Sequence, residues 1–481
     1  MSETSNTYLA KEKVGKLILK FSIPCIMSLL VSALYNIVDQ IFIGRGIGYL
    51  GNGATNVVFP ITIISLAIAL MLGDGSAAYL SLCQGKKDIK SANKSVGNAI
   101  TLLVSCGIIM AIVFAVFKNE ILFAFGATEN NFAYANEYFN YIVIGIPFFV
   151  LGNGLNSIIR ADQSPKFAMI TTLLGCIINV ILDPIAIFVL NMGMKGAALA
   201  TITGQIVTAL CGILYIRKAK TFKITLDGLK LSLDIVKRFV PLGISSFLTQ
   251  ISIVVIMGVM NNVLVKYGAM SKYGADIPLT VVGIVMKVFQ IVVSVCIGIA
   301  AGSQPIIGYN YGAGEKERVR EIFFTILKAE AVVGAVSFIL FEVFPLQITS
   351  IFGSEDGLYN EFAILSFRVF LSMIILTCIQ KSVSVFLQAL GKPVMAMTLS
   401  LMRDFLFSVP LAIVLPMFMG VEGALLSAPI ADILTTFAVI VFSLKILKEL
   451  KTVDTERYAY ENSKSKENSK TKMPNTVKAY N

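Results

Sequence analysis

The chain has 481 residues, of which 56% are hydrophobic and 14% are charged, with a net charge of +11 and neither histidine nor tryptophan. Soluble domains carry roughly 25% charged residues. The composition therefore excludes an ordinary soluble enzyme and indicates an all-α integral membrane protein. The absence of histidine excludes histidine-based catalytic triads, histidine-ligated metals and haem, and histidine proton relays.

Twelve apolar runs are long enough to cross a hydrocarbon core of about 30 Å, which takes about 20 helical residues. They are Leu17–Ile43, Ala54–Cys83, Ser95–Phe117, Tyr138–Ile159, Phe167–Leu190, Gly196–Ile216, Val236–Val265, Ile277–Gly302, Ile322–Phe344, Leu358–Leu387, Val394–Met417 and Val421–Leu447. The first run is too long for a signal peptide and lacks a clear cleavage site, so we expect it to remain in the mature protein.

Lysine and arginine are distributed unevenly between the two sides of these runs. The N-terminus, the loops after even-numbered runs and the C-terminal end carry 31 of the 40 basic residues. Since cytoplasmic loops are enriched in Lys and Arg, this bias predicts a multi-pass protein of the cell (inner) membrane with both termini in the cytoplasm. It also accounts for the net charge without a nucleic-acid partner. The loops after odd-numbered runs hold Arg45, Lys118, Lys195, Lys266 and Lys272.

Two segments are too polar for the membrane. Residues 218–238 form a charged connector in which Leu226, Leu229, Leu233 and Val236 recur at helical spacing, which predicts a short surface helix in a cytoplasmic linker. Residues 451–481 are rich in Lys, Ser, Asn and Glu, which predicts a disordered tail. The expected domains are an N-lobe (1–217, runs one to six), the linker (218–238), a C-lobe (239–450, runs seven to twelve) and the tail.

The seven cysteines all fall inside apolar runs, and none forms a Cys-x-x-Cys motif. We interpret them as free thiols that pack as small apolar groups, with no disulfide or metal framework.

An internal repeat relates the two sets of six runs. Gly75–Ser76 followed by Gly85 matches Gly302–Ser303 followed by Gly312, 227 residues later. A second match pairs Arg160–Ala161 and Pro165 with Gln388–Ala389 and Pro393. Because each copy spans an even number of helices, the copies share one orientation and should be related by a pseudo-two-fold axis along the membrane normal, with a cavity between them. This arrangement favours an alternating-access transporter over a channel or a receptor.

The fifth run carries an acid inside the membrane. Asn179 and Asp183 are four residues apart, so both lie on one helix face. Pro184 has no N–H to donate, which leaves the carbonyl of Val180 free one turn earlier. A buried carboxylate is costly in a bilayer and is kept where it binds a proton or ion, faces a polar cavity or finds a partner. The alternative is an acid satisfied by neighbouring helices.

Several short motifs follow one another along the apolar runs. They are Pro24, Asn36 and Asp39 in the first run, Gly73–Asp74–Gly75–Ser76 in the second, Arg160–Ala161 with Pro165 after the fourth, and Gly196–Ala197–Ala198 with Ala200–Thr201 opening the sixth. Together with the helix count, this set resembles the multidrug and toxic compound extrusion (MATE) family over roughly residues 15–450, most of all its DinF-like and MepA-like branch. The resemblance implies two six-helix bundles and drug efflux, and it places a cation-binding and protonation site at the matching acids of the first lobe.

Depth along the helices agrees with a common site. At 1.5 Å per residue, Asp39 lies roughly 28 Å and Asp183 roughly 26 Å above the inner ends of their helices, and Thr201 roughly 9 Å below the outer end of its own. We therefore expect Asp39, Asn179, Asp183 and Thr201 to converge on a site for H⁺ or Na⁺, since two adjacent carboxylates do not both ionise easily without a cation. Asn36 is a further candidate ligand. Polar helix packing is the alternative for Asn36 and Thr201.

The second lobe lacks equivalents of both acids, because Asp39 maps to about Ile256 and Asp183 to about Pro410. Its own charges, Arg403, Asp404 and Asp432, predict a structural ion-pair network. Basic and polar candidates for the substrate cavity are Lys287, Gln290, Lys381 and Arg403, although Lys287 and Lys381 can instead pair with Glu330.

The sequence thus predicts a monomeric cation-coupled antiporter, driven by H⁺ or Na⁺, that exports organic, cationic compounds. No cofactor, metal other than Na⁺, or enzymatic activity is expected. A flippase for lipid-linked precursors is an alternative, but it needs a strongly basic cavity. A membrane-embedded transferase is a weaker one, because no clustered acidic or histidine motif occurs.

Overall fold

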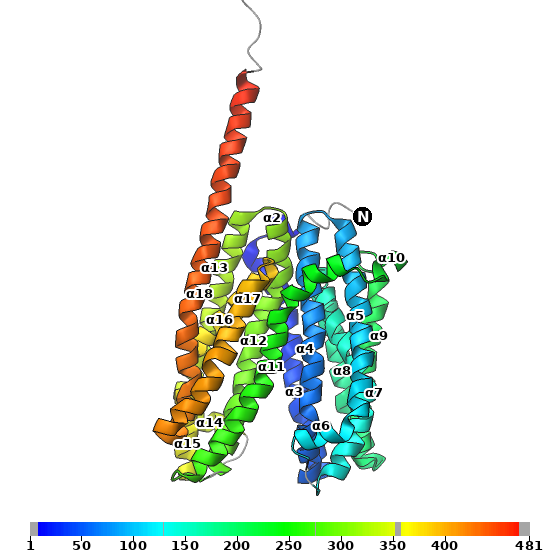
Figure 1. Ribbon diagram of the computed structural model, residues 1–481, viewed down its shortest axis with the longest axis vertical. Helices are drawn as coiled ribbons and strands as arrows, with labels where there is room; N and C mark the ends of the chain where they lie inside the picture. Colours follow the sequence, from blue (N-terminus) through cyan, green and yellow to red (C-terminus); the bar gives the residue numbers. More distant parts are fainter. Residues whose placement is uncertain (1–7, 128, 275, 352–356, 471–481) are drawn as a thin grey trace, which may run out of the picture.

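The computed structural model describes residues 8–127, 129–274, 276–351 and 357–470. These residues form a bundle of long helices divided into two lobes (Figure 1). Ten helices are long and apolar enough to cross a membrane, and a bent pair makes an eleventh span. The part of the chain that is described contains no strand, so the predicted all-α membrane class is confirmed.

The N-lobe contains the first six spans. A short helix, α2 (Tyr8–Lys11), precedes them, and α6 (Lys118–Ala124) lies between the third and fourth. The six spans are α3 (Val14–Gly46), α4 (Tyr49–Gly85), α5 (Ile89–Val116), α7 (Phe132–Ala161), α8 (Pro165–Pro184) continued by the π-helix η1 (Ile185–Val189), and α9 (Gly193–Ile216).

The C-lobe contains the other six. Its elements are α11 (Leu233–Ala269), α12 (Asp276–Gly312), α13 (Lys316–Val343), α14 (Pro345–Ser350), α15 (Leu358–Phe370), α16 (Ile374–Ala389), α17 (Pro393–Ser400), the π-helix η2 (Leu401–Ser408) and α18 (Val409–Lys470).

Two breaks account for the difference between ten helices and the twelve predicted spans. Helices α15 and α16 meet at a bend of 45° and form one broken span. Within α18 the backbone leaves the helical region at Gly420, where φ is +62°. A positive φ is favourable only for glycine, and this turn separates the eleventh span from the twelfth. The twelve-span, two-bundle arrangement is therefore confirmed.

The linker differs in detail from the expectation. The predicted surface helix is confined to α10 (Leu226–Leu229), and α11 begins already at Leu233. The linker also lies against α5, where the Asn98 amide donates to the carbonyls of Gly228 (2.9 Å) and Lys230 (3.0 Å). The 3.6-residue periodicity identified the helical residues but not the break between the two helices.

Helix α18 continues past the end of the bundle to Lys470 (Figure 1), and the disorder expected for residues 451–481 stays a prediction. Lys, Glu and Arg are good helix formers, and the preceding span supplies a helix that is already nucleated. Residues 471–481 of the predicted tail lie outside the described residues.

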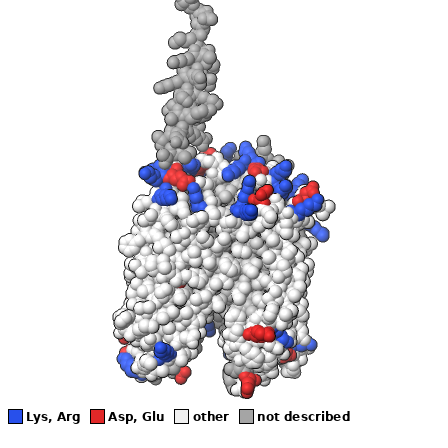
Figure 2. Space-filling model, in the orientation of Figure 1, with Lys and Arg blue, Asp and Glu red and all other residues white. Residues whose placement is uncertain are grey.

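Lys and Arg side chains gather at one end of the bundle, which we call the basic end. It comprises the loops around Lys86–Lys94, Arg217–Lys230, Lys316–Arg320 and Lys392; α2 lies at this end, and α18 leaves the bundle there (Figures 1 and 2). Figure 2 shows that the lobes are in contact near this end and that a cleft between them opens at the opposite end.

Glycines bring the lobes together at the basic end. A Cβ atom on Gly243 of α11 would lie 1.8 Å from the carbonyl oxygen of Met71 on α4, and one on Gly75 of α4 would lie 2.4 Å from the carbonyl oxygen of Phe239. The backbones of α4 and α11 are therefore in direct contact. Close backbone approach through small residues is the usual way for membrane helices to pack tightly.

The repeat is visible in this contact. Gly85 and Gly312, which match in the two copies, meet each other across the lobe boundary, because a Cβ on Gly312 would lie 3.2 Å from the Cα of Gly85. Equivalent residues that touch must lie close to the axis that relates the copies. Pro165 and Pro393 likewise occupy equivalent places, at the first turn of α8 and α17.

Candidate functional site

Asn179 connects helices α8 and α9 in the interior of the N-lobe. The orientation of its amide that satisfies both neighbours donates a hydrogen bond to Asp183 Oδ2 (3.1 Å). In that orientation the amide oxygen accepts from the Thr201 backbone N–H and hydroxyl, each at 3.2 Å. Asp183 is completely buried and Asn179 is nearly so. The predicted i, i+4 face thus exists, and Thr201 belongs to it.

Two glycines allow this contact. A Cβ on Gly204 of α9 would lie 2.6 Å from the carbonyl oxygen of Gly175 on α8. The two backbones are close enough that the short Asn179 side chain spans the gap to Thr201, one turn from Gly204.

Asp39 approaches the same place from α3. Its carboxyl group lies close to that of Asp183. Asp39 Oδ1 is buried and has no hydrogen-bond partner among the described residues. In the part of the chain that the structure describes, no Lys or Arg forms an ion pair with either acid. Two adjacent acids without a basic neighbour can be accommodated by a shared proton or by a bound cation.

The backbone beyond Asp183 is irregular, as Pro184 predicts. Helix α8 gives way at Ile185 to the π-helix η1, against which the end of α3 packs, since a Cβ on Gly46 would lie 2.2 Å from the Ile187 side chain. Short π-helical segments inside helices are frequent at functional sites. The fifth span of the C-lobe contains the corresponding segment η2.

Two tyrosines that the sequence did not single out lie beside the acids, and one predicted residue lies elsewhere. Tyr138 of α7 lies near Thr201, and Tyr35 of α3 lies near both acids. Tyr35 is four residues before Asp39, so helical spacing could have identified it, whereas Tyr138 is brought in only by tertiary packing. Asn36 is exposed and donates to the Ser32 carbonyl (2.9 Å), so the structure does not bring it to the cluster.

In the C-lobe four intramembrane charges form one ion-paired network. The Arg403 guanidinium donates to Asp404 Oδ1 (2.7 Å) and to Asp432 Oδ1 (2.9 Å), and Lys381 Nζ lies 3.7 Å from Asp404 Oδ2. The Ser252 hydroxyl donates a hydrogen bond to Asp404 Oδ2 (2.7 Å), and the Thr377 hydroxyl donates one to Asp432 Oδ2 (2.6 Å). The predicted ion-pair network is confirmed, and its two cations and two anions cancel.

The four residues predicted for the substrate cavity therefore fall into two groups. Lys287 and Gln290 are exposed on α12. Lys381 and Arg403 belong to the ion-pair network, and the cavity that they line measures only about 20 Å³. A space of that size accommodates a water molecule and not a drug. The suggested pairing of Lys381 with Glu330 is wrong, because Asp404 takes that place.

Asp74 joins the two lobes near the basic end. Its Oδ1 accepts from Ser157 (2.6 Å) and Arg160 (3.4 Å) of the N-lobe, and its Oδ2 accepts from Ser246 of α11 (2.9 Å). A carboxylate that bridges the lobes can stabilise the closed basic end.

Twelve spans in two pseudosymmetric lobes, with a cleft between them and polar side chains buried in each lobe, define the class of duplicated membrane transporters. The chain belongs to the MatE family, whose family model matches residues 24–185 and 244–414.

Relatives and solved structures agree with this assignment over nearly the whole chain. The multidrug export protein MepA of Staphylococcus aureus (strain N315) is 25% identical over 458 residues, which cover 95% of this chain and 99% of the relative. MepA of Staphylococcus haemolyticus is 28% identical over 459 residues, which cover 92% of this chain and 97% of the relative.

Two solved structures share the fold. A MOP superfamily transporter from Pyrococcus furiosus superposes with a TM-score of 0.86 at 22% identity, over 94% of this chain and all of the other. An outward-facing conformation of a multidrug resistance MATE family transporter gives the same TM-score, identity and coverage.

Proposed function

We propose that this protein is an antiporter that exports organic, cationic compounds and is driven by H⁺ or Na⁺ entering through Asp39 and Asp183. The observation that carries the proposal is the electrostatic difference between the N-lobe acid pair and the C-lobe ion-pair network. Asp404 and Asp432 are neutralised by Arg403 and Lys381, whereas the described residues offer Asp39 and Asp183 no basic partner. A pair of uncompensated acids in the membrane needs a cation, so its affinity for that cation can drive transport.

The relatives support the exported substrate class. Two are multidrug export proteins by name, and export requires the cleft to open away from the cytoplasm. In the orientation that places the basic end in the cytoplasm, the cleft of Figure 2 opens to the outside. A flippase for lipid-linked phosphates is less well supported, because two of the four basic candidates, Lys381 and Arg403, are already occupied by carboxylates.

The decisive experiment measures export in proteoliposomes under an imposed pH or Na⁺ gradient. We expect Asp39→Asn and Asp183→Asn each to abolish coupled export, since the neutral amide keeps the shape and removes the titrating charge. If the acids share one cation, the double variant should be no worse than either single variant. Response to only one of the two gradients would identify the coupling ion.

Asp227→Asn provides the matched control, because Asp227 is an exposed acid of the linker and forms an ion pair with exposed Lys230. It should export like the wild type. Coupled export by the double variant Asp39→Asn/Asp183→Asn at the wild-type rate, with equal protein in the vesicles, would refute the N-lobe site.

A further inference from the structure

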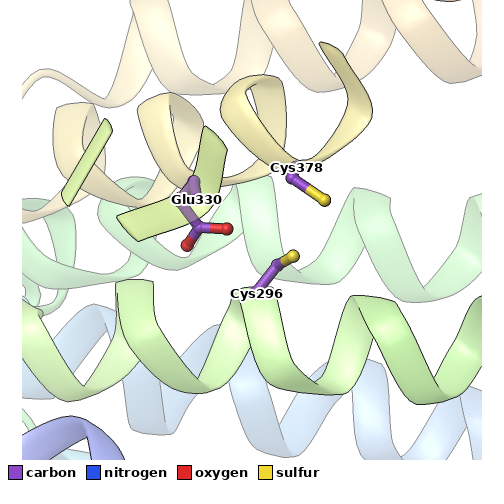
Figure 3. Close-up of side chains that lie close together, drawn as sticks. All are labelled: Cys296, Glu330 and Cys378. Carbon is purple, nitrogen blue, oxygen red and sulfur yellow. The ribbon is translucent and has the colours of Figure 1, made fainter. Parts of the chain in front are cut away.

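Three helices of the C-lobe direct a thiol, a second thiol and a carboxylate towards one point. Cys296 comes from α12, Glu330 from α13 and Cys378 from α16, and one ligand atom of each lies within 4.8 Å of the other two. Figure 3 shows the two sulfur atoms facing each other beside the Glu330 carboxylate. The three residues are between 0% and 2% exposed, so water does not solvate them.

Glu330 lacks the partners that a buried acid requires. Its Oε1 accepts a hydrogen bond from the Ser382 hydroxyl. Its Oε2 is buried and has no hydrogen-bond partner among the described residues, and no Lys or Arg in that part of the chain pairs with it. A buried, unsatisfied carboxylate oxygen costs at least about 1–3 kcal/mol. Packing of small thiols explains the two cysteines, but it does not explain this acid between them.

We propose that Cys296, Cys378 and Glu330 form a binding site for a thiophilic divalent cation, with Zn²⁺ as the physiological ligand. Two sulfurs and one carboxylate oxygen are a ligand set that Zn²⁺ accepts, and a fourth position remains for water or another donor. Around a tetrahedral Zn²⁺ these atoms would be about 3.6–3.8 Å apart, from the usual Zn–S and Zn–O distances. The present separations of up to 4.8 Å require only small side-chain movements to reach that geometry.

Binding of the cation depends on pH because its ligands bind in their deprotonated forms. A divalent ion that takes Cys296 and Cys378 as thiolates and Glu330 as a carboxylate releases three protons from the protonated site. The apparent Kd should therefore increase by up to about 1000-fold for each unit by which the pH is lowered while the free site stays protonated.

Occupation of the site would fasten α12, α13 and α16 to one another. Thr377, the residue before Cys378 on α16, donates a hydrogen bond to Asp432 of the ion-pair network. The proposed ion would therefore stabilise the helix that carries both Cys378 and Thr377. This inference is independent of the coupling ion and of the exported substrate.

The test uses the purified full-length chain in detergent, freed of metal and kept reduced. We expect Cd²⁺ titration to produce a thiolate-to-metal absorption band that saturates at one equivalent per chain, and Zn²⁺ to compete for it and to raise the thermal unfolding temperature. Cys296→Ser, Cys378→Ser and Glu330→Gln should each lose the one-equivalent band and the Zn²⁺-dependent rise in Tm.

Cys211→Ser is the matched control, because Cys211 is a partly buried thiol of α9 outside the cluster. It should keep both signals. Three similar variants guard against one that fails to fold, and each is accepted only if it elutes as a single species. The proposal is overturned if the wild-type chain gives no saturable band, if the band persists in both cysteine variants, or if Glu330→Gln binds with the wild-type Kd.

Discussion

Asn179 joins Asp183 of its own helix to Thr201 of α9 through its amide. We expect Asn179→Ala to weaken coupling without abolishing it, because a neutral ligand is lost and both acids remain. The loss of a hydrogen bond to a charged group costs about 1.5–3 kcal/mol. This loss corresponds to a cation concentration for half-maximal export that is roughly 10- to 150-fold higher.

The measurement is export rate against the concentration of the driving cation. Asn153→Ala is a suitable control, because the Asn153 amide donates only to the Phe149 carbonyl within its own helix. An unchanged half-maximal concentration in Asn179→Ala would show that the amide does not contribute to the site.

Asp432 has a structural role in our interpretation, in contrast to Asp183. Asp432→Asn should reduce stability by about 3–5 kcal/mol, because it leaves the Arg403 charge buried with one anion fewer. Thermal unfolding of the purified protein measures this loss. The folded fraction should keep the cation dependence of the wild type, and a loss of that dependence at normal stability would assign coupling to the C-lobe instead.

At the scale of the helices, contact between α4 and α11 controls the closed basic end. Gly243→Val places a branched side chain where the Met71 carbonyl lies, so we expect it to separate the lobes at that end. Gln304, which is buried and donates to the Asp74 carbonyl across the boundary (3.4 Å), is a reporter position. A Gln304→Cys variant should react with a soluble thiol reagent only when Gly243→Val is also present.

Gly258→Val lies on the same helix, and nothing is within 4 Å of a Cβ at that position. It should leave Gln304→Cys protected. Labelling must exceed that of the same chain without Gln304→Cys, since the native thiols react too. Equal protection in the Gly243 and Gly258 variants would mean that the contact does not keep the basic end closed.

Helix number, helix limits within a few residues and the duplication could all be predicted from the sequence, because hydrophobic length and repeated glycines are local signals. The convergence of Asn179, Asp183 and Thr201 was also predictable, since helical rise fixes depth. The break at Gly420 was expected only as a gap between two apolar runs. The position of the linker against α5 could not be predicted, because it depends on hydrogen bonds of Asn98 that neither hydrophobic length nor periodicity indicates.

The cluster of Cys296, Glu330 and Cys378 could not be predicted from the sequence. The residues are 34 and 48 positions apart along the chain and belong to three different helices, so neither spacing nor periodicity relates them. For Lys381 the sequence suggested Glu330 as the partner, whereas the structure pairs it with Asp404. Only the packing of α16 against its neighbours decides between them.

At the scale of the whole molecule, the basic end determines the orientation. We expect both termini in the cytoplasm, because the basic residues concentrate at the end where α2 begins and α18 leaves the bundle (Figure 2). A reporter enzyme or fluorescent protein fused after Lys451 should be active only in its cytoplasmic form. A fusion that is active only outside the cell would invert the orientation and the direction of the cleft.

The unequal charge of the two lobes has a consequence for the membrane potential. The ion-pair network of the C-lobe carries no net charge through the electric field, whereas two ionised N-lobe acids without their cation carry negative charge. Moving one elementary charge across 100 mV changes the free energy by about 2.3 kcal/mol. With one shared cation, the N-lobe site carries two negative charges when it is empty and one when it is occupied. Under the proposed mechanism, and apart from the charge of the exported compound itself, the step in which the empty site is re-exposed to the other side therefore depends more strongly on voltage than the step in which the occupied site reorients.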